Sequence, residues 1–361
     1  MKKYFTFVSI LLALLLIAGC ERRTKLYVLS WGEYISKDVI EKFEKEYGVR
    51  VVLSEATSNE SMHNKIQTGA GKYDIVIPSD YMLERMVEDD LLIELDFDLL
   101  PNYDESKFDP KLQELRNNYF EGNKKYGVPY FWGTLGIMYN KAKPGVKELV
   151  EENSWKVFFE PEIIPNGVSV GMYDSSRDAV AAAMLYLGRD LNTTNDKDYV
   201  DAEAALKRMK YAQWGTDDLK EAVASKNLDI ALVYSGDFFD TLYFFVENDI
   251  DVTFDMFVDQ NNNNIWFDVM VIPKTSKNVE LAHAFINFFL DEENAIENAS
   301  YIGYCPPLTP VYEALLADEE LAPLVTHPAY YPGNVNGTVY RHLGVDIALK
   351  MDAILSRVKI Q

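Results

Sequence analysis

Short apolar runs alternate with amphipathic segments in the first part of the chain. Residues 26–30 and 51–53 have the apolar, β-branched character of strands. Between them, apolar side chains recur at helical spacing from Val39 to Tyr47. Ser36 is a suitable N-cap and Gly48 a suitable C-terminal stop, so we expect a helix between these two residues.

The alternation continues with a helix expected at 61–68 and a buried strand at 73–79. Strands that alternate with helices indicate an α/β fold with a parallel sheet and helices on its faces. In such sheets, ligands bind beyond the carboxyl ends of the strands. We therefore expect residues Trp31–Tyr34 and Ser79–Tyr81 on the ligand side.

Two long apolar stretches interrupt this pattern. Residues 126–140 are aromatic and glycine-rich, which fits either an extended crossover between two lobes or an ordinary buried strand. Residues 265–273 follow a polar turn expected at 261–264 and form a second crossover candidate. The remaining elements that we expect are helices at 177–187, 202–212 and 279–290 and a strand at 228–234.

The charge balance favours cationic over anionic guests. The 361 residues, enough for two domains, include 57 Asp plus Glu and 35 Lys plus Arg, for a formal net charge of −22. Such a chain repels phosphate backbones, so we expect no nucleic-acid partner. The alternative is that the acidity only keeps the protein soluble.

The N-terminus has the pattern of an export signal. Lys2 and Lys3 precede an apolar run over 7–18, which is too short to span a bilayer. The tetrapeptide ending at Cys20 resembles the bacterial lipobox, in which cleavage leaves a lipidated cysteine. We therefore expect a signal peptide at 1–19, a lipidated tether at 20–25, and a protein anchored to the outer face of the cell membrane or periplasmic. An ordinary signal with an incidental cysteine is the alternative.

The sequence gives little support for catalysis or metal binding. It contains no Gly-x-Ser-x-Gly, Walker or His-Glu-x-x-His motif. Its two cysteines and four scattered histidines lack the spacing of a zinc site, and Cys305 reads as a small buried apolar residue. We expect no enzymatic activity, no metal and no cofactor.

Aromatic residues stand beside carboxylates near several expected strand ends. A polyamine requires this mixture, because each ammonium needs an anion while the methylene spacer prefers apolar or aromatic walls. Each pair alone is weak evidence, because Tyr and Trp near turns usually serve ordinary packing. The pairs are Trp31 with Glu33 and Tyr34, Asp80 with Tyr81, Tyr234 with Asp237, and Trp266 with Asp268.

A collinear set of motifs resembles the spermidine/putrescine-binding proteins of bacterial ABC transporters. The likeness extends in order from Leu26 to beyond Gly303. The motifs are residues 29–35, 57–62, 73–79, 128–133, 187–188, 192–194, 234–237, 266–268 and 285–290.

The resemblance implies a two-lobed periplasmic-binding-protein-like (type II) fold with two hinge crossover segments. Lobe 1 would comprise 26–131 plus 268–306, and lobe 2 would comprise 132–267 plus 307–361. The implied function is binding of putrescine, spermidine or both by a monomer between the lobes and delivery to the permease subunits of an ABC importer.

The resemblance also implies roles for single residues. Asp268 matches the aspartate that typically engages an ammonium, Asp237 an aspartate of putrescine-type members, Asp178 a glutamate, and Glu33 an aspartate in some members. Ser79 would lie near the first-lobe turn, beside Asp80. The aromatic walls would be Trp31, Tyr34, Tyr81, Tyr234 and Trp266.

Three positions depart from the family pattern. Tyr234 stands where a tryptophan is common. Ser175 stands where spermidine-type members have an acid, and Arg341 stands where a glutamine is common. A positive charge from Arg341 near the cleft would oppose a third ammonium and favour putrescine; alternatively, Arg341 neutralises surplus carboxylates.

Two other interpretations remain open at the level of the sequence. The same architecture could serve ferric iron, thiamine or an amino acid, and Tyr330–Tyr331 is similar to the tyrosine pairs of iron-binding proteins, although no matching acid and histidine set accompanies it. The fold could also be the scaffold of a surface lipoprotein used for adhesion or signalling.

Overall fold

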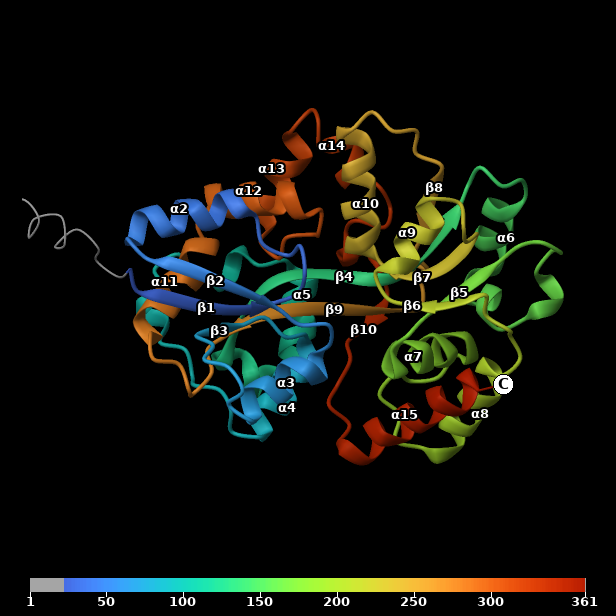
Figure 1. Cartoon of the computed structure of the whole chain (residues 1–361), viewed down its shortest axis with the longest axis horizontal. Coiled ribbons are helices and arrows are strands. Elements are labelled where there is room, and N and C mark those ends of the chain that lie inside the picture. The colour runs from blue at the N-terminus through green and yellow to red at the C-terminus, as the bar shows by residue number, and fades with distance from the viewer. Residues whose placement is uncertain (1–22, 361) are drawn as a thin grey trace, which may run out of the picture.

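Two long strands, β4 (Gly127–Asn140) and β9 (Asn263–Val271), form the spine of the computed structural model, which describes residues 23–360. They pair antiparallel from Gly127 opposite Val271 to Thr134 opposite Ile265. Every residue of both strands is buried. Strands covered on both faces read as continuous apolar runs, which explains why these stretches stood out in the sequence. Both strands pass through the centre of Figure 1 and connect its two halves.

The first half of the sheet is built from the N-terminal strands. β1 (Lys25–Ser30) pairs parallel with β2 (Arg50–Glu55) and with β3 (Ile75–Val76), and β3 pairs antiparallel with β9. In Figure 1 this half carries α2 and α12 above the sheet and α3 and α4 below it. The helices of this half are α2 (Lys37–Tyr47), α3 (Asn59–Gln67), α4 (Asp80–Glu88), α5 (Pro110–Tyr119), α11 (Val279–Phe289) and α12 (Glu292–Ile302).

The second half repeats the arrangement on the other side of the spine. β5 (Val170–Tyr173) pairs parallel with β6 (Gln213–Gly215) and β7 (Ile230–Tyr234), while β7 and β8 (Phe254–Phe257) pair antiparallel with β4. Figure 1 shows α9 and α10 above these strands and α7, α8 and α15 below them. The helices here are α6 (Val146–Asn153), α7 (Ser176–Leu187), α8 (Asp196–Leu206), α9 (Asp218–Ala224), α10 (Ser235–Glu247) and α15 (Val345–Lys359).

The C-terminal part of the chain returns across both halves. α13 (Thr309–Ala317) and α14 (Ala322–Val325) lead to β10 (Gly337–Thr338), which pairs parallel with β9. The chain then runs down between the two halves before it enters α15 (Figure 1). Within residues 23–360, none of the helices combines the length and the apolarity needed to cross a bilayer.

The structure confirms the α/β class and the two-lobed architecture, and it corrects three details. The expected parallel sheet is mixed, because β4 and β9 run antiparallel to the strands beside them. The helix expected at 202–212 is α8, which begins earlier because the Asn195 side chain caps it, and the chain then turns into β6. The polar turn expected at 261–264 ends sooner, since Asn263 and Asn264 are buried in β9 and bond to the carbonyl oxygens of Leu135 and Thr338.

Candidate ligand-binding site between the two lobes

Asp268 is a buried carboxylate on the first-lobe side of the junction. It lies in β9, is only 4% exposed, and forms an isolated bridge with Ser79, the residue before α4. Tyr34 donates its hydroxyl to Oδ2 of Asp268 at 2.7 Å. The other oxygen, Oδ1, has no hydrogen-bond partner within residues 23–360. Asp268 is therefore a buried acid with one free acceptor.

Burial decides the protonation of this carboxyl. Loss of hydration raises the pKa of Asp268 to about 6, although the nearby Ser79, Tyr34 and Trp31 side chains favour the charged form. A cation bound at Oδ1 would lower the pKa of Asp268 again and favour its ionised form. The site is therefore suited to a guest that brings positive charge with it.

Asp80 lies next to this group, in the first turn of α4. Oδ1 of Asp80 accepts the backbone N–H of Tyr81 at 2.7 Å, and among the described residues Oδ2 has no partner. Burial, with Asp268 and Glu84 nearby, raises the pKa of Asp80 well above its usual range. The first lobe thus presents two buried acids side by side.

A row of aromatic rings connects the acids of the two lobes. Tyr34 meets Tyr304 with ring centroids 5.1 Å apart, and Tyr304 meets Trp266 at 5.7 Å. Trp266 meets Tyr234 at 5.7 Å, and Tyr234 meets Tyr173 at 5.3 Å. All four contacts are edge-to-face, the arrangement in which the edge of one ring meets the face of the next.

Two glycines allow this row to form. A Cβ atom on Gly133 would lie 2.5 Å from the Trp266 ring. A Cβ atom on Gly236 would lie 2.0 Å from the Tyr304 ring. Side chains at these two positions would displace the rings, so Gly133 in β4 and Gly236 in α10 each have a direct packing reason.

The carboxylates of the second lobe differ because side chains already bind them. Asp178, in the first turn of α7, accepts hydroxyl hydrogen bonds at Oδ1 from Tyr234 at 2.7 Å and from Tyr340 at 3.0 Å. Asp237, in α10, accepts the hydroxyl of Tyr304 at 2.7 Å and lies 3.9 Å from Nζ of Lys220.

Burial also raises the pKa values of these two carboxyls. The pKa of Asp178 is raised, and the hydroxyl hydrogen bonds limit that rise. The pKa of Asp237 is raised to about 6 despite the positive charge of Lys220. Even with their protein partners, both carboxylates would be stabilised in their ionised form by a nearby ammonium.

Arg341 faces a carboxylate rather than open space. Its Nε donates to Oε1 of Glu84 at 2.8 Å, and the backbone N–H of His342 donates to Oε2 of Glu84 at 2.8 Å. Glu84 belongs to α4, so this ion pair joins the C-terminal segment to the first lobe. The contact fits the alternative in which Arg341 neutralises a carboxylate.

Most of the residues singled out in the sequence lie at this junction. Trp31 and Ser79 are close enough to Asp268 to lower its pKa. Tyr81 packs across the junction against Tyr340 of the second lobe, with ring centroids 6.3 Å apart. Glu33 is the exception. It is exposed, has a left-handed φ of 50°, and makes none of the hydrogen bonds or ion pairs found in the described region.

Sequence reasoning missed five residues at the junction. They come from segments that reach the junction only through the tertiary fold, and no local spacing marks them. Tyr304 and Tyr340 follow α12 and β10, while Tyr173 ends β5. The two cations are Arg177, on α7, and Lys220, on α9 (Asp218–Ala224).

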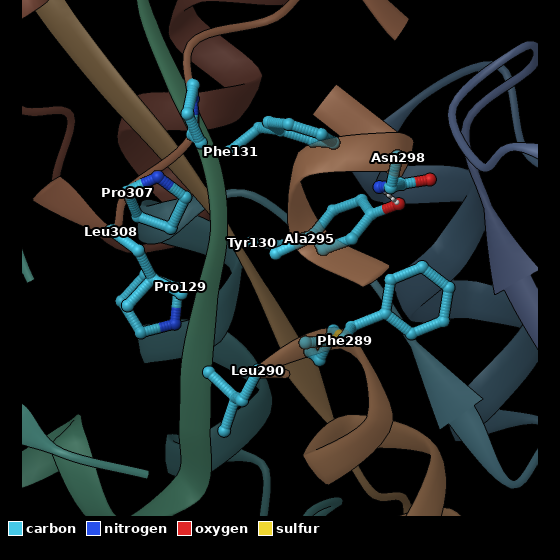
Figure 2. A pocket seen from close by; sticks show the side chains of 11 residues that line it. Pro129, Tyr130, Phe131, Phe289, Leu290, Ala295, Asn298, Pro307 and Leu308 are labelled. Carbon is cyan, nitrogen blue, oxygen red and sulfur yellow. Dashed lines mark hydrogen bonds between the residues drawn. The ribbon is translucent and has the colours of Figure 1, made fainter. Parts of the chain in front are cut away.

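A small cavity beside β4 lies behind the candidate site. Figure 2 shows it lined by Pro129, Tyr130, Phe289 and Asn298, and its volume is about 20 Å³. That is space for roughly one water molecule, so it is no polyamine site. The Tyr130 hydroxyl accepts from Asn298 at 2.9 Å and donates to the backbone oxygen of Tyr34 at 2.7 Å. This wall therefore holds Tyr34 in position.

The residues considered for metal binding have other partners. In the described part of the chain, no three His, Cys, Asp or Glu side chains are grouped to hold a metal ion. Tyr330 donates to the backbone oxygen of Tyr304 at 3.2 Å, and Tyr331 bonds to Asp109. Cys305 is buried and free, as expected. Cys20 lies outside the described residues.

Two lobes joined by paired long strands, with acids and aromatic rings at their junction, define the class of two-lobed solute receptors. A family model described as bacterial extracellular solute-binding protein matches residues 38–326. The chain belongs to this family.

Similar proteins in this family carry polyamine names. The chain is 32% identical over 285 residues to the putrescine-binding periplasmic protein SpuD of Pseudomonas aeruginosa, with 77% of each chain covered. Its fold matches the spermidine/putrescine ABC transporter substrate-binding protein PotD of Streptococcus pneumoniae with a TM-score of 0.76, 30% identity, and coverage of 93% of this chain and 99% of that one. The Tp0655 (TpPotD) lipoprotein of Treponema pallidum matches with a TM-score of 0.74 and 26% identity over 93% of this chain and 100% of that one.

Proposed function

We propose that this protein binds a polyamine, putrescine or spermidine, between its lobes and delivers it to the permease subunits of an ABC importer. The single observation that carries the proposal is the buried carboxylate of Asp268. Its Oδ1 has no partner within residues 23–360, and aromatic side chains surround it. The names of similar proteins, which bind putrescine or spermidine, support the same ligand class.

The energies of such contacts are sufficient for tight binding. A hydrogen bond to a charged group contributes about 1.5–3 kcal/mol, and a dry cation–π contact contributes up to about 2 kcal/mol. Micromolar affinity corresponds to about 8 kcal/mol. Two or three contacts of each kind reach this value after the cost of ordering the ligand and the lobes.

Binding would be coupled to closure of the lobes. The first lobe contributes Asp268 and Tyr34, while the second contributes Asp178 and Tyr234, so only the closed form brings all contacts to one ligand. A ligand that binds the closed form more strongly shifts the population toward it. The permease would then recognise the closed form, and the protein itself would carry out no covalent step.

We further propose the lobe division and the membrane attachment that the sequence suggested. Lobe 1 comprises 26–131 plus 268–306, and lobe 2 comprises 132–267 plus 307–361. The monomeric protein would be held at the membrane by lipid on Cys20. A similar protein that is named a lipoprotein supports this attachment.

The ligand proposal is tested by isothermal titration calorimetry on the mature protein. Putrescine, cadaverine and spermidine form one panel, and amino acids, thiamine and ferric iron form the other. We expect saturable binding, with a Kd in the micromolar range or below, for at least one polyamine and none in the second panel. Absence of polyamine binding, or tighter binding of a member of the second panel, would overturn the proposal.

Membrane attachment is tested separately in cells. Metabolic labelling with a radioactive fatty acid should mark the wild-type protein, while a Cys20→Ala variant should remain unlabelled. Equal labelling of both forms would contradict the role of Cys20 and leave the ligand proposal unaffected.

A further inference from the structure

Arg177 places a permanent cation inside the candidate site. Its Cζ lies 3.9 Å from the centroid of the Tyr81 ring and 5.4 Å from that of Tyr340. Arg177 belongs to α7 of the second lobe, whereas Tyr81 belongs to α4 of the first. The guanidinium thus stacks on an aromatic wall that the sequence had assigned to the ligand.

The surroundings of Arg177 are those of an ammonium subsite. Asp80 lies on its first-lobe side and Asp178 on its second-lobe side, and the positive charge of Arg177 acts on both carboxyls. Neither carboxylate approaches the guanidinium within ion-pair distance. The guanidinium instead donates a hydrogen bond to the backbone oxygen of Arg341 at 3.3 Å. An aromatic face with acids on two sides is where a cationic nitrogen of a ligand would also be stable.

The charge of Arg177 therefore competes with a ligand nitrogen at this end of the ring row. A second cation at contact distance would meet like-charge repulsion that the low-dielectric surroundings strengthen. Asp268 has no basic side chain among the groups that shift its pKa, and among the described residues its Oδ1 has no hydrogen-bond partner. Asp237, on which Arg177 does not act, remains available for a second nitrogen.

We propose that Arg177 is a specificity-determining residue that fills the third cationic position of the site and so selects diamines over triamines. The guanidinium on Tyr81 takes the place that a third ligand nitrogen would need. This inference rests on the proposed polyamine function and refines its ligand class. The selection expected of Arg341 in the sequence is thereby assigned to a different arginine, since Arg341 is paired with Glu84.

The test compares the spermidine-to-putrescine ratio of Kd values in the wild type and in an Arg177→Gln variant. The wild type should bind putrescine at least tenfold more tightly than spermidine. Arg177→Gln removes the charge but keeps a long polar side chain, so the ratio should fall at least tenfold. Arg177→Lys keeps the charge and should retain the diamine preference.

Arg208→Gln is the matched control, because it changes charge by the same amount on the exposed surface, where Arg208 pairs with Glu162. It should leave the ratio unchanged. A wild type that prefers spermidine, or an Arg177→Gln variant that folds and weakens both ligands equally, would overturn the role of Arg177. Failure of every polyamine to bind wild-type protein would instead overturn the proposed function.

Discussion

The buried acids of the two lobes differ in the hydrogen bonds that they accept. Asp268, on the first-lobe side, receives one tyrosine hydroxyl and keeps one oxygen without a partner among residues 23–360. Asp178, in the second lobe, receives two tyrosine hydroxyls on a single oxygen. Both groups are at least nine-tenths buried. The difference therefore lies in their hydrogen bonds and not in their exposure to water.

This contrast suggests that the acids of the two lobes have different roles in ligand binding. A buried carboxylate that lacks a donor is costly in the empty protein, and a ligand ammonium relieves that cost. A carboxylate already bound by hydroxyls is less costly and gains less from the ligand. We therefore expect Asp268 to supply most of the charge recognition, and the second-lobe acids to position the far end of the ligand.

The largest expected effect follows from removing the charge of Asp268. Truncating one partner of a buried charge pair costs about 2–5 kcal/mol, so Asp268→Asn should weaken polyamine binding about 100-fold. Asp178→Asn is the matched variant in the second lobe and should weaken binding about tenfold. Calorimetric titration measures both, and equal losses would remove the contrast between the lobes.

Trp266 lies between the two acid groups, and its removal should weaken binding by at least about tenfold. Trp266→Ala deletes a ring that contacts both Tyr234 and Tyr304, so it affects the apolar wall for the methylene spacer. Circular dichroism establishes that the variant is folded. Trp214→Ala serves as the control, since Trp214 packs against Tyr211 away from the junction and should leave affinity unchanged.

Binding should also weaken in acid. Asp268 has a pKa near 6 in the ligand-free protein, so at pH 5 only about a tenth of it is ionised. Polyamine affinity should therefore fall about tenfold from pH 7.5 to pH 5, and the fall should be smaller in Asp268→Asn. Asp237, whose pKa is also about 6, accounts for the pH dependence of affinity that remains in this variant.

The stability of the ligand-free protein should change in the opposite direction. The folded-state pKa of Asp268 lies above its ordinary value, so folding favours the protonated form. This contribution is complete below about pH 4 and is lost as the pH rises through about 6. The difference in Tm between Asp268→Asn and wild type should thus grow in favour of the variant between pH 4 and pH 7.5. A constant difference would contradict the raised pKa.

The smallest effects are expected from single hydroxyl groups. Tyr34→Phe removes the one side-chain hydroxyl bond to Asp268, and Tyr304→Phe removes the corresponding bond to Asp237. Each bond to a charged group contributes about 1.5–3 kcal/mol, but it is present in the ligand-free protein as well, so only part of it is lost from binding. Each variant should therefore lose affinity by about threefold to fivefold. Because both rings remain, a loss as large as that of Trp266→Ala would show that the hydroxyls, and not the aromatic surfaces, dominate.

The sequence predicted the fold better than it predicted the completed site. The apolar runs at 126–140 and 265–273 identified the two spine strands, because burial on both faces leaves a continuous apolar pattern. The same pattern carries no information on strand direction, so the antiparallel pairing of the spine was missed. Helix ends were found where a cap was evident, as at Gly48, whose φ is 66°.

The candidate site could be predicted only where its residues follow strands or match a motif. Trp31, Tyr34 and Asp80 fulfil the first condition, and Trp266 and Asp268 the second. Tyr304 and Arg177 fulfil neither condition. Tyr304 reaches the site because Gly236 leaves room for its ring, and Arg177 does so because α7 packs opposite α4. Such placements depend on contacts between distant segments.

A crystal structure of the putrescine complex would test the central claim most directly. The account predicts one ligand nitrogen within hydrogen-bond distance of Oδ1 of Asp268, with the methylene chain against Trp266. A ligand bound elsewhere, or a carboxylate of Asp268 that points away from it, would contradict the account.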